Sequence, residues 1–193
     1  MNTTHGHNVT EQELLTSVSA GDMQAFEQLY QLYEKRVFQY VCTFLRDQAA
    51  AEEVVSDTML AVWQGAGQFA QTSRVSTWIF GIARHKALDA VRRYVRRQHD
   101  VELDHAADLP QHDADSIDRI HRDQVATLTQ QAMSRLSQDH REILRLVYDE
   151  ELPYEEIASL LSIPSNTVKT RVFYAKQQLK RHLSSLHMED AVT

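Results

Sequence analysis

The segment SIPSNTVKTRVFYAKQQLKR, residues 162–181, combines hydrogen-bonding side chains with positive charge in a pattern suited to nucleic acids. It contains five Lys or Arg residues and no Asp or Glu, although the chain of 193 residues has a formal net charge of -7. Asn pairs with adenine, Arg and Lys pair with guanine, and every cation attracts phosphate. Because an acid would repel the DNA backbone, the stretch without acids from 157 to 188 indicates a DNA-binding face.

This segment and the residues before it have helix-turn-helix spacing. The pattern predicts a helix over 154–161, a tight connection over 162–164 and a longer helix from residue 165. The second helix of such a motif lies in the major groove, and its N-terminal side chains reach base edges. A basic helix that only packs in a bundle is the alternative reading. The positions expected to contact DNA are Ser165, Asn166, Lys169, Thr170, Arg171, Tyr174 and Lys176.

A second basic helix is predicted over residues 77–97, with Ser76 as its N-cap. Its inward stripe is expected to contain Trp78, Ile79, Ile82, Ala83, Ala87, Ala90 and Tyr94. Its cations are Arg84, Lys86, Arg92, Arg93, Arg96 and Arg97. They are opposed locally only by Asp89, which shares a face with His85 and Arg92. Cations at a helix C-terminus also suit the macrodipole, so this pattern is compatible with either polyanion binding or simple helix stabilisation.

A third pattern of interest is an acidic helix face. Asp47 is expected to cap a helix that ends near Gly65, and Glu53, Asp57 and Leu60 lie on its outer side. Acids on one side of a helix are typical of a solvated face, and they are also suited to docking a basic partner helix. Spacing alone favours the solvated face.

The whole chain is predicted to be all-α, because it has five Gly and three Pro residues and no sustained strand-like alternation. Further helix starts are expected at Thr10 with Glu13, at Asp22 and at Ser137. Residues 98–125 contain two basic and eight acidic residues without helical periodicity, which indicates a flexible acidic linker. We therefore expect two small helical domains, over 10–97 and 126–187.

Other classes of site are not expected. No segment suits membrane insertion, and we expect no cofactor, metal or catalytic residues. The one cysteine, Cys42, lies among apolar residues and is expected to be buried. The histidines match no metal motif, and solvated side chains are expected at His5, His7, His99, His105, His112 and His121.

Two blocks of sequence resemble the extracytoplasmic-function (ECF) group of the sigma-70 family of bacterial sigma factors. DQAAAEEVVSDTMLAVWQ followed by STWIFGIARHKALDAVRR is similar to sigma region two, and LPYEEIASLLSIPSNTVKTRVFYAKQQL is similar to sigma region four. The order of the blocks, the linker and the chain length fit this family. The resemblance implies an alternative sigma factor that binds core RNA polymerase and directs promoter-specific transcription initiation in the cytoplasm, without being an enzyme.

The resemblance also implies roles for residues. The contact with core polymerase, which involves the beta-prime coiled coil and the beta subunit, would use Glu52, Glu53, Asp57 and Leu60. The melted minus-ten strand would be bound by Ser73, Arg74, Ser76, Arg84, His85, Lys86, Arg92 and Arg93. Region four would bind the minus-thirty-five element of promoter DNA through the seven positions from Ser165 to Lys176 named above. An anti-sigma factor that covers these faces is also expected.

Three departures from the family pattern and two alternative functions accompany this prediction. Pro153 stands where a capping Ser or Thr is common, and it suits a first helical position but removes a side-chain cap. Ser162 stands where many relatives have Gly, so a residue with a side chain must adopt the turn geometry. His85 stands where the family often has Asn, which changes the side chain available for the local DNA contact. The alternative functions are that of a helix-turn-helix transcription regulator acting without a sigma role, and that of a helical adaptor that does not bind DNA.

Overall fold

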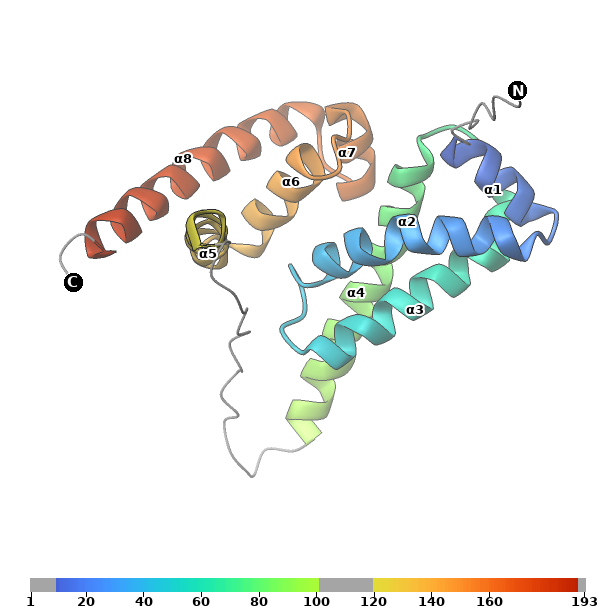
Figure 1. Cartoon of the computed structure of the whole chain (residues 1–193), viewed down its shortest axis with the longest axis horizontal. Coiled ribbons are helices and arrows are strands. Elements are labelled where there is room, and N and C mark those ends of the chain that lie inside the picture. The colour runs from blue at the N-terminus through green and yellow to red at the C-terminus, as the bar shows by residue number, and fades with distance from the viewer. Residues whose placement is uncertain (1–9, 101–119, 191–193) are drawn as a thin grey trace, which may run out of the picture. The chain divides into compact units, whose positions relative to one another are not determined.

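The computed structural model describes residues 10–100 and 120–190 of the chain. These residues form helices and no strand, which confirms the all-α prediction (Figure 1). The chain divides into two compact units, Met1–Glu102 and Leu103–Thr193. Most of the predicted linker lies outside the described residues, so the finer domain boundaries stay a prediction. No helix in the described ranges has the length and apolar character needed to cross a membrane.

The first unit is a helical bundle in which α3 packs against both α2 and α4. Its elements are α1 (Glu11–Ser19), α2 (Met23–Val41), α3 (Gln48–Gly65), the 3-10 segment η1 (Ala66–Gln68) and α4 (Val75–Asp100). The second unit is built around one long helix, which the three preceding helices contact. Its elements are α5 (Ile120–Ser134), α6 (Gln138–Tyr148), α7 (Tyr154–Leu161) and α8 (Ser165–Asp190).

Most helix starts follow the caps expected from the sequence. Thr10 and Glu13 form a reciprocal capping box, in which the Thr10 N–H donates to the Glu13 carboxylate over 2.8 Å. The side chains of Asp22, Asp47 and Ser137 accept backbone N–H bonds at the starts of α2, α3 and α6. These caps satisfy N–H groups that have no partner inside the helix.

The expected cap at Ser76 is wrong by two residues. Helix α4 begins at Val75, and the Trp78 N–H donates to the Arg74 carbonyl over 3.1 Å. Arg74 therefore stands where the chain enters the helix, and Ser76 lies inside the first turn. Its residue exposure is 6%, so it does not lie on the outer surface of α4.

Aromatic rings fill the core of the first unit. Phe80 is fully buried and meets Tyr33 and Tyr40 at centroid distances of 6.3 and 5.2 Å. Phe80 was not among the positions predicted for the inward stripe of α4. The prediction of Tyr94 in this stripe is wrong, because Tyr94 is 57% exposed. Figure 1 shows the last turns of α4 running past the end of the α2–α3 pair, so this part of the helix has no bundle to cover it.

The expectation of a buried Cys42 is also wrong, because its side chain is exposed. Cys42 is the C-cap of α2, with φ -63° and ψ -10°. The neighbouring Tyr40 and Val41 occupy the core-facing positions at this end of the helix. An apolar sequence neighbourhood therefore did not determine the direction of the cysteine side chain.

The second unit contains the expected helix-turn-helix. Ser162 ends α7 in the left-handed region at φ 55° and ψ 44°, and the Ile163 N–H donates to the Ala158 carbonyl over 3.0 Å. Val168, Val172 and Ala175 of α8 are buried, at spacings of three and four residues that place them on one side of the helix. The opposite side of the N-terminal half of α8 is consequently presented to solvent.

Candidate nucleic-acid interfaces

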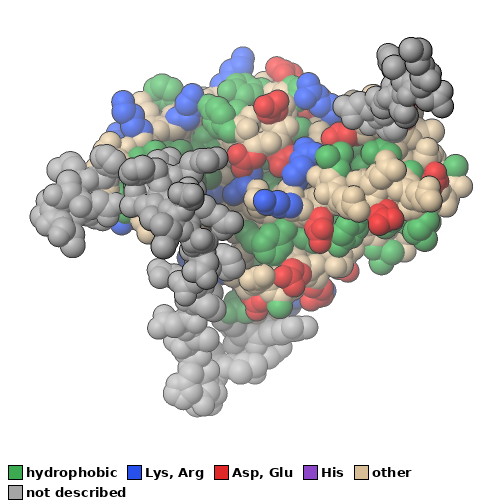
Figure 2. Space-filling model, viewed as in Figure 1, with side chains coloured by type: hydrophobic (Ala, Val, Ile, Leu, Met, Phe, Trp, Pro, Cys, Tyr) green, Lys and Arg blue, Asp and Glu red, His purple; other side chains and the backbone are tan. Residues whose placement is uncertain are grey.

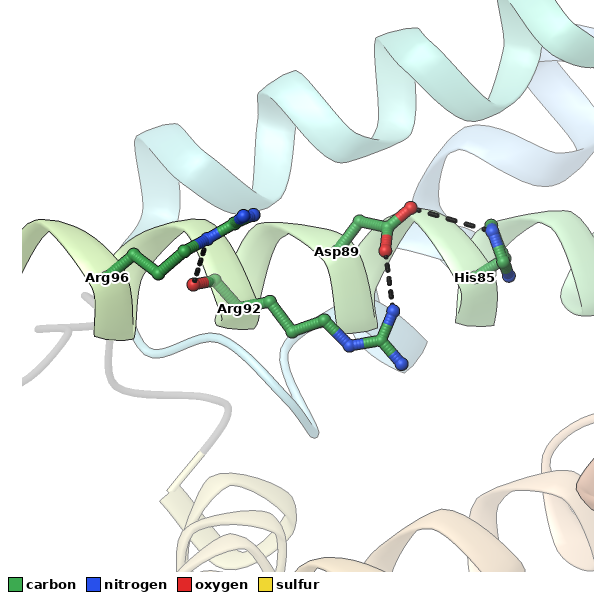
Figure 3. A network of polar contacts seen from close by, with 4 residues as sticks. All are labelled: His85, Asp89, Arg92 and Arg96. Carbon is green, nitrogen blue, oxygen red and sulfur yellow. Dashed lines mark hydrogen bonds and ion pairs between the residues drawn. The ribbon is translucent and has the colours of Figure 1, made fainter.

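The outer face of α4 carries a short network of charged side chains (Figure 3). The carboxylate of Asp89 accepts a hydrogen bond from Arg92 Nη1 over 2.9 Å, and its other oxygen lies 3.5 Å from His85 Nε2. The next cation along, Arg96, donates from Nε to the Arg92 carbonyl over 3.3 Å. These spacings of three and four residues bring the four side chains onto one side of the helix. The resulting face is exposed and predominantly basic.

Beside this network lies a hollow that the sequence analysis did not identify. It has a volume of ≈ 440 Å³ and is lined by Trp78, Gly81, Ile82, His85 and Lys86. The Trp78 ring is half-buried and packs against Phe69 at 5.2 Å between centroids. An accessible indole next to cations suits the stacking of a nucleobase whose phosphate the cations attract. The useful sequence signal was Gly81, whose missing side chain leaves space one turn after the tryptophan.

The other residues predicted for the minus-ten strand differ in accessibility. Arg74 is exposed, whereas Ser73, Arg84 and Lys86 are half-buried and Ser76 is buried. The Arg93 guanidinium lies 3.7 Å from the carboxylate of Glu53 on α3. This contact joins a residue predicted to bind DNA to a residue predicted to bind polymerase.

Helix α3 presents the predicted acidic face. Glu52 and Glu53 are exposed, Asp57 is half-buried, and Leu60 is 54% exposed despite its apolar side chain. Next to it, α2 and α3 border a shallow hollow of ≈ 460 Å³, in which Glu52 and Val55 face Tyr30 and Phe38. Figure 2 shows acidic and apolar side chains interspersed over these two helices. A surface of this kind suits a partner helix with both basic and apolar side chains.

The N-terminal half of α8 presents the predicted DNA-reading side chains. Asn166, Lys169 and Thr170 are exposed, Ser165 is half-buried, and Tyr174 is 53% exposed. Figure 2 shows Lys and Arg side chains along this helix. Phe173, which was not predicted from the sequence, is 56% exposed and meets the Tyr174 ring edge-on at 5.5 Å between centroids. The helical periodicity could have revealed it, since Phe173 directly follows an inward position.

Two cations of α8 contact α6, another helix of the same unit. Arg171 Nη2 lies 3.1 Å from the Asp139 carboxylate of α6, and its side chain is 24% exposed. The Lys176 ammonium lies 5.4 Å from the centroid of the Tyr148 ring. Hydrogen bonding to Tyr148 raises the pKa of Lys176. Both cations therefore help to hold α8 against α6.

Comparison with known proteins shows the family to which the chain belongs. Two family models match the chain in series: Sigma-70 region 2 over residues 29–97 and Sigma-70 region 4 over residues 127–179. The chain is 30% identical over 167 residues to the ECF RNA polymerase sigma factor RpoE of Cereibacter sphaeroides, covering 84% of this chain and 88% of that protein. The chain belongs to the ECF group of the sigma-70 family.

Further relatives agree with this assignment. The chain is 28% identical over 190 residues to the RNA polymerase sigma-H factor of Pseudomonas aeruginosa, covering 93% of this chain and 96% of that one. The fold matches the sigma factor RpoE of Bartonella quintana, solved with the anti-sigma factor NepR, with a TM-score of 0.68, 24% identity and coverage of 84% and 98%. The sigma-factor prediction is confirmed, and the alternative of a regulator without a sigma role is not supported. Sigma factors are non-catalytic factors of transcription initiation.

Proposed function

We propose that this sigma factor docks on core RNA polymerase through α3 and reads two promoter elements through α4 and α8. The observation that carries the proposal is the presence of two separate exposed basic helix faces, one in each compact unit of a single chain. Each face combines cations with accessible aromatic rings. Two such modules on one chain suit a promoter with two elements separated by a spacer.

The polymerase contact is proposed for the acidic face of α3. Glu52, Glu53 and Asp57 would meet basic side chains of the polymerase, and the exposed Leu60 would supply an apolar anchor. Such an arrangement directs docking by charge and gains affinity from apolar burial. The beta-prime coiled coil is the proposed partner for this face, and the beta subunit is a further proposed contact of the factor.

The minus-ten strand is proposed to bind along α4 and the loop before it. Ser73 and Arg74 would contact the strand from the loop, whereas the buried Ser76 would support the first turn from inside. The proposed phosphate and base contacts along the helix are Arg84, His85, Lys86, Arg92 and Arg93. Stacking of a base on Trp78 would offset the cost of removing that base from the duplex, which is a few kcal/mol.

The minus-thirty-five element is proposed to lie against the N-terminal half of α8. Asn166, Lys169 and Thr170 have the exposure needed to reach base edges, and Phe173 suits a thymine methyl group. Arg171 contacts Asp139, and Lys176 contacts Tyr148. Because these contacts hold the two cations to α6, we assign them to phosphates beside the major groove and not to base edges within it. Ser165 and Tyr174 complete the proposed surface.

The proposal also covers the place where the protein acts and a further partner. We propose that the protein has no bond-making step of its own and acts in the cytoplasm, where polymerase and promoter DNA meet. We also propose an anti-sigma partner that covers the α3 and DNA-binding faces. A solved protein of similar fold supports this, since the sigma factor RpoE of Bartonella quintana forms a complex with the anti-sigma factor NepR.

The experiment that tests the proposal is run-off transcription from a promoter library with purified core polymerase. Addition of the wild-type factor is expected to select two-part promoters. Asp57→Arg on the α3 face should abolish selection, because it places a cation where basic side chains dock. Glu27→Arg, the same charge reversal at an exposed position of α2, is the matched control and should retain activity. Failure of the wild-type factor to bind core or to change start-site choice would refute the proposal.

A further inference from the structure

Asp89 is a negatively charged residue on the otherwise basic face of α4. It is the one acidic residue in the stretch 84–97, which also contains seven Lys, Arg or His residues. One carboxylate oxygen of Asp89 lies 2.9 Å from Arg92 Nη1, and the other lies 3.5 Å from His85 Nε2 (Figure 3). One carboxylate therefore contacts two of the side chains proposed to bind the minus-ten strand.

This geometry makes the carboxylate a competitor of DNA phosphate. A phosphate that binds Arg92 Nη1 must share or replace the hydrogen bond to Asp89, and a phosphate at any other donor of Arg92 still meets the negative charge of Asp89. The pair lies at the surface, with side-chain exposures of 65% for Arg92 and 45% for Asp89. Solvent screens such pairs, so the effect on DNA affinity should be about fivefold at most.

We propose that Asp89 is a specificity-determining residue of the minus-ten interface. It lowers the affinity of α4 for DNA of any sequence by neutralising Arg92 and occupying His85. Because the loss is the same at strong and weak sites, the ratio of their affinities is unchanged, but weak sites no longer reach the occupancy needed for initiation and the set of promoters used becomes narrower. This inference rests on the proposed function of α4. To the expected contacts, most of which are cations, it adds one residue with a negative charge.

The competing explanation is purely structural. Acidic and basic side chains three or four residues apart stabilise an isolated helix slightly, whatever the helix binds. The two explanations differ in what the removal of the charge does. Loss of a helix-stabilising pair lowers the melting temperature and leaves DNA affinity unchanged or weaker, whereas loss of a competitor strengthens binding to DNA of any sequence.

The test compares full-length Asp89→Asn with the wild-type chain, using a fluorescent single-stranded dT oligonucleotide as the sequence-independent probe. Asp89→Asn keeps the side-chain shape and should bind this probe about two- to fivefold more tightly. Its plot of log affinity against log salt should steepen by up to about 0.7, the value for one added phosphate contact on a single strand. Glu27→Gln removes one exposed carboxylate from α2 and is expected to change neither quantity.

A double-mutant cycle identifies the mechanism. In an Arg92→Gln background, Asp89→Asn should lose most of its effect on the probe, because the cation that it neutralises is gone. Tighter binding that persists unchanged in this background would overturn the role given to the Arg92 contact. Unchanged or weaker binding of Asp89→Asn in the wild-type background would overturn the inference itself.

Transcription separates failure of this inference from failure of the proposed function. With core polymerase, Asp89→Asn should initiate from a wider set of library promoters than the wild-type factor. If the wild-type factor selects promoters and the variant selects the same set with the same preference, the specificity role of Asp89 is refuted while the proposed function stands. If the wild-type factor selects none, the proposed function fails first.

Discussion

The turn between α7 and α8 allows a prediction about stability. The substitution of serine by glycine should stabilise the second unit at Ser162 and destabilise it three residues earlier, at Ser159. Ser162 lies in the left-handed region at φ 55° and ψ 44°, and its side chain is exposed. A non-glycine residue there costs about 1–2 kcal/mol, whereas glycine adopts this conformation readily but loses about 0.5–1 kcal/mol more backbone entropy on folding. Ser162→Gly should therefore stabilise the second unit by about 1 kcal/mol.

The matched control is the same substitution within α7. Ser159 has helical neighbours on both sides, and its hydroxyl donates to the Glu155 carbonyl over 3.0 Å. Glycine in a helix interior is less favourable than serine, so Ser159→Gly should destabilise the unit by about 0.5 kcal/mol. Identical chemistry at the two positions thus gives opposite signs.

Native-state hydrogen exchange, followed by mass spectrometry on peptides from α7 and α8, measures both effects. The slowest amides of these peptides should exchange about fivefold more slowly in Ser162→Gly and faster in Ser159→Gly. Tryptophan fluorescence in urea provides an internal control, because Trp63 and Trp78 both lie in the first unit and their transition should not move. Faster exchange in Ser162→Gly would refute the assignment of backbone strain to this turn.

Three further predictions concern packing, ion pairing and pH. Phe80→Ala should destabilise the first unit by about 3–5 kcal/mol, measured by tryptophan fluorescence in urea, because it leaves a cavity between two tyrosines. A double-mutant cycle on Asp139 and Arg171 should give a coupling of about 1 kcal/mol or less in hydrogen exchange of α8, because the pair is partly exposed. Burial raises the pKa of the Tyr33 hydroxyl, and the nearby Glu11 carboxylate adds to this shift. Its contribution to stability is therefore present below its unfolded pKa of about 10 and is lost as the pH rises above it. Tyr33→Phe should remove this alkaline loss in urea titrations at increasing pH.

The features predicted well from sequence are those set by neighbours along the chain. The caps at Thr10, Asp22 and Asp47 depend on hydrogen bonds to residues two or three positions away, which the sequence displays directly. The end of α7 at Ser162 is equally local. The buried positions of α8 follow from its 3.6-residue period, since one side of a helix must cover the core.

The features predicted poorly depend on where a helix lies relative to others. Tyr94 continues the apolar stripe of α4, yet the bundle ends before it, and periodicity carries no information about that limit. The ion pair of Asp139 with Arg171 joins helices 32 positions apart in the chain, and its geometry sets how far the arginine can reach. The hollow at Trp78 likewise depends on ring orientation, which spacing does not specify.

The most direct test of the account is to ask whether α4 and α8 read separate promoter elements. Run-off transcription from a randomised promoter library, with core polymerase and either the wild-type factor or Lys169→Ala, gives the selected sequences for each. We expect two motifs at a fixed spacing with the wild-type factor, and loss of preference in the upstream motif alone with Lys169→Ala. Equal loss of preference in both motifs, or none in either, would contradict the assignment of the upstream element to α8.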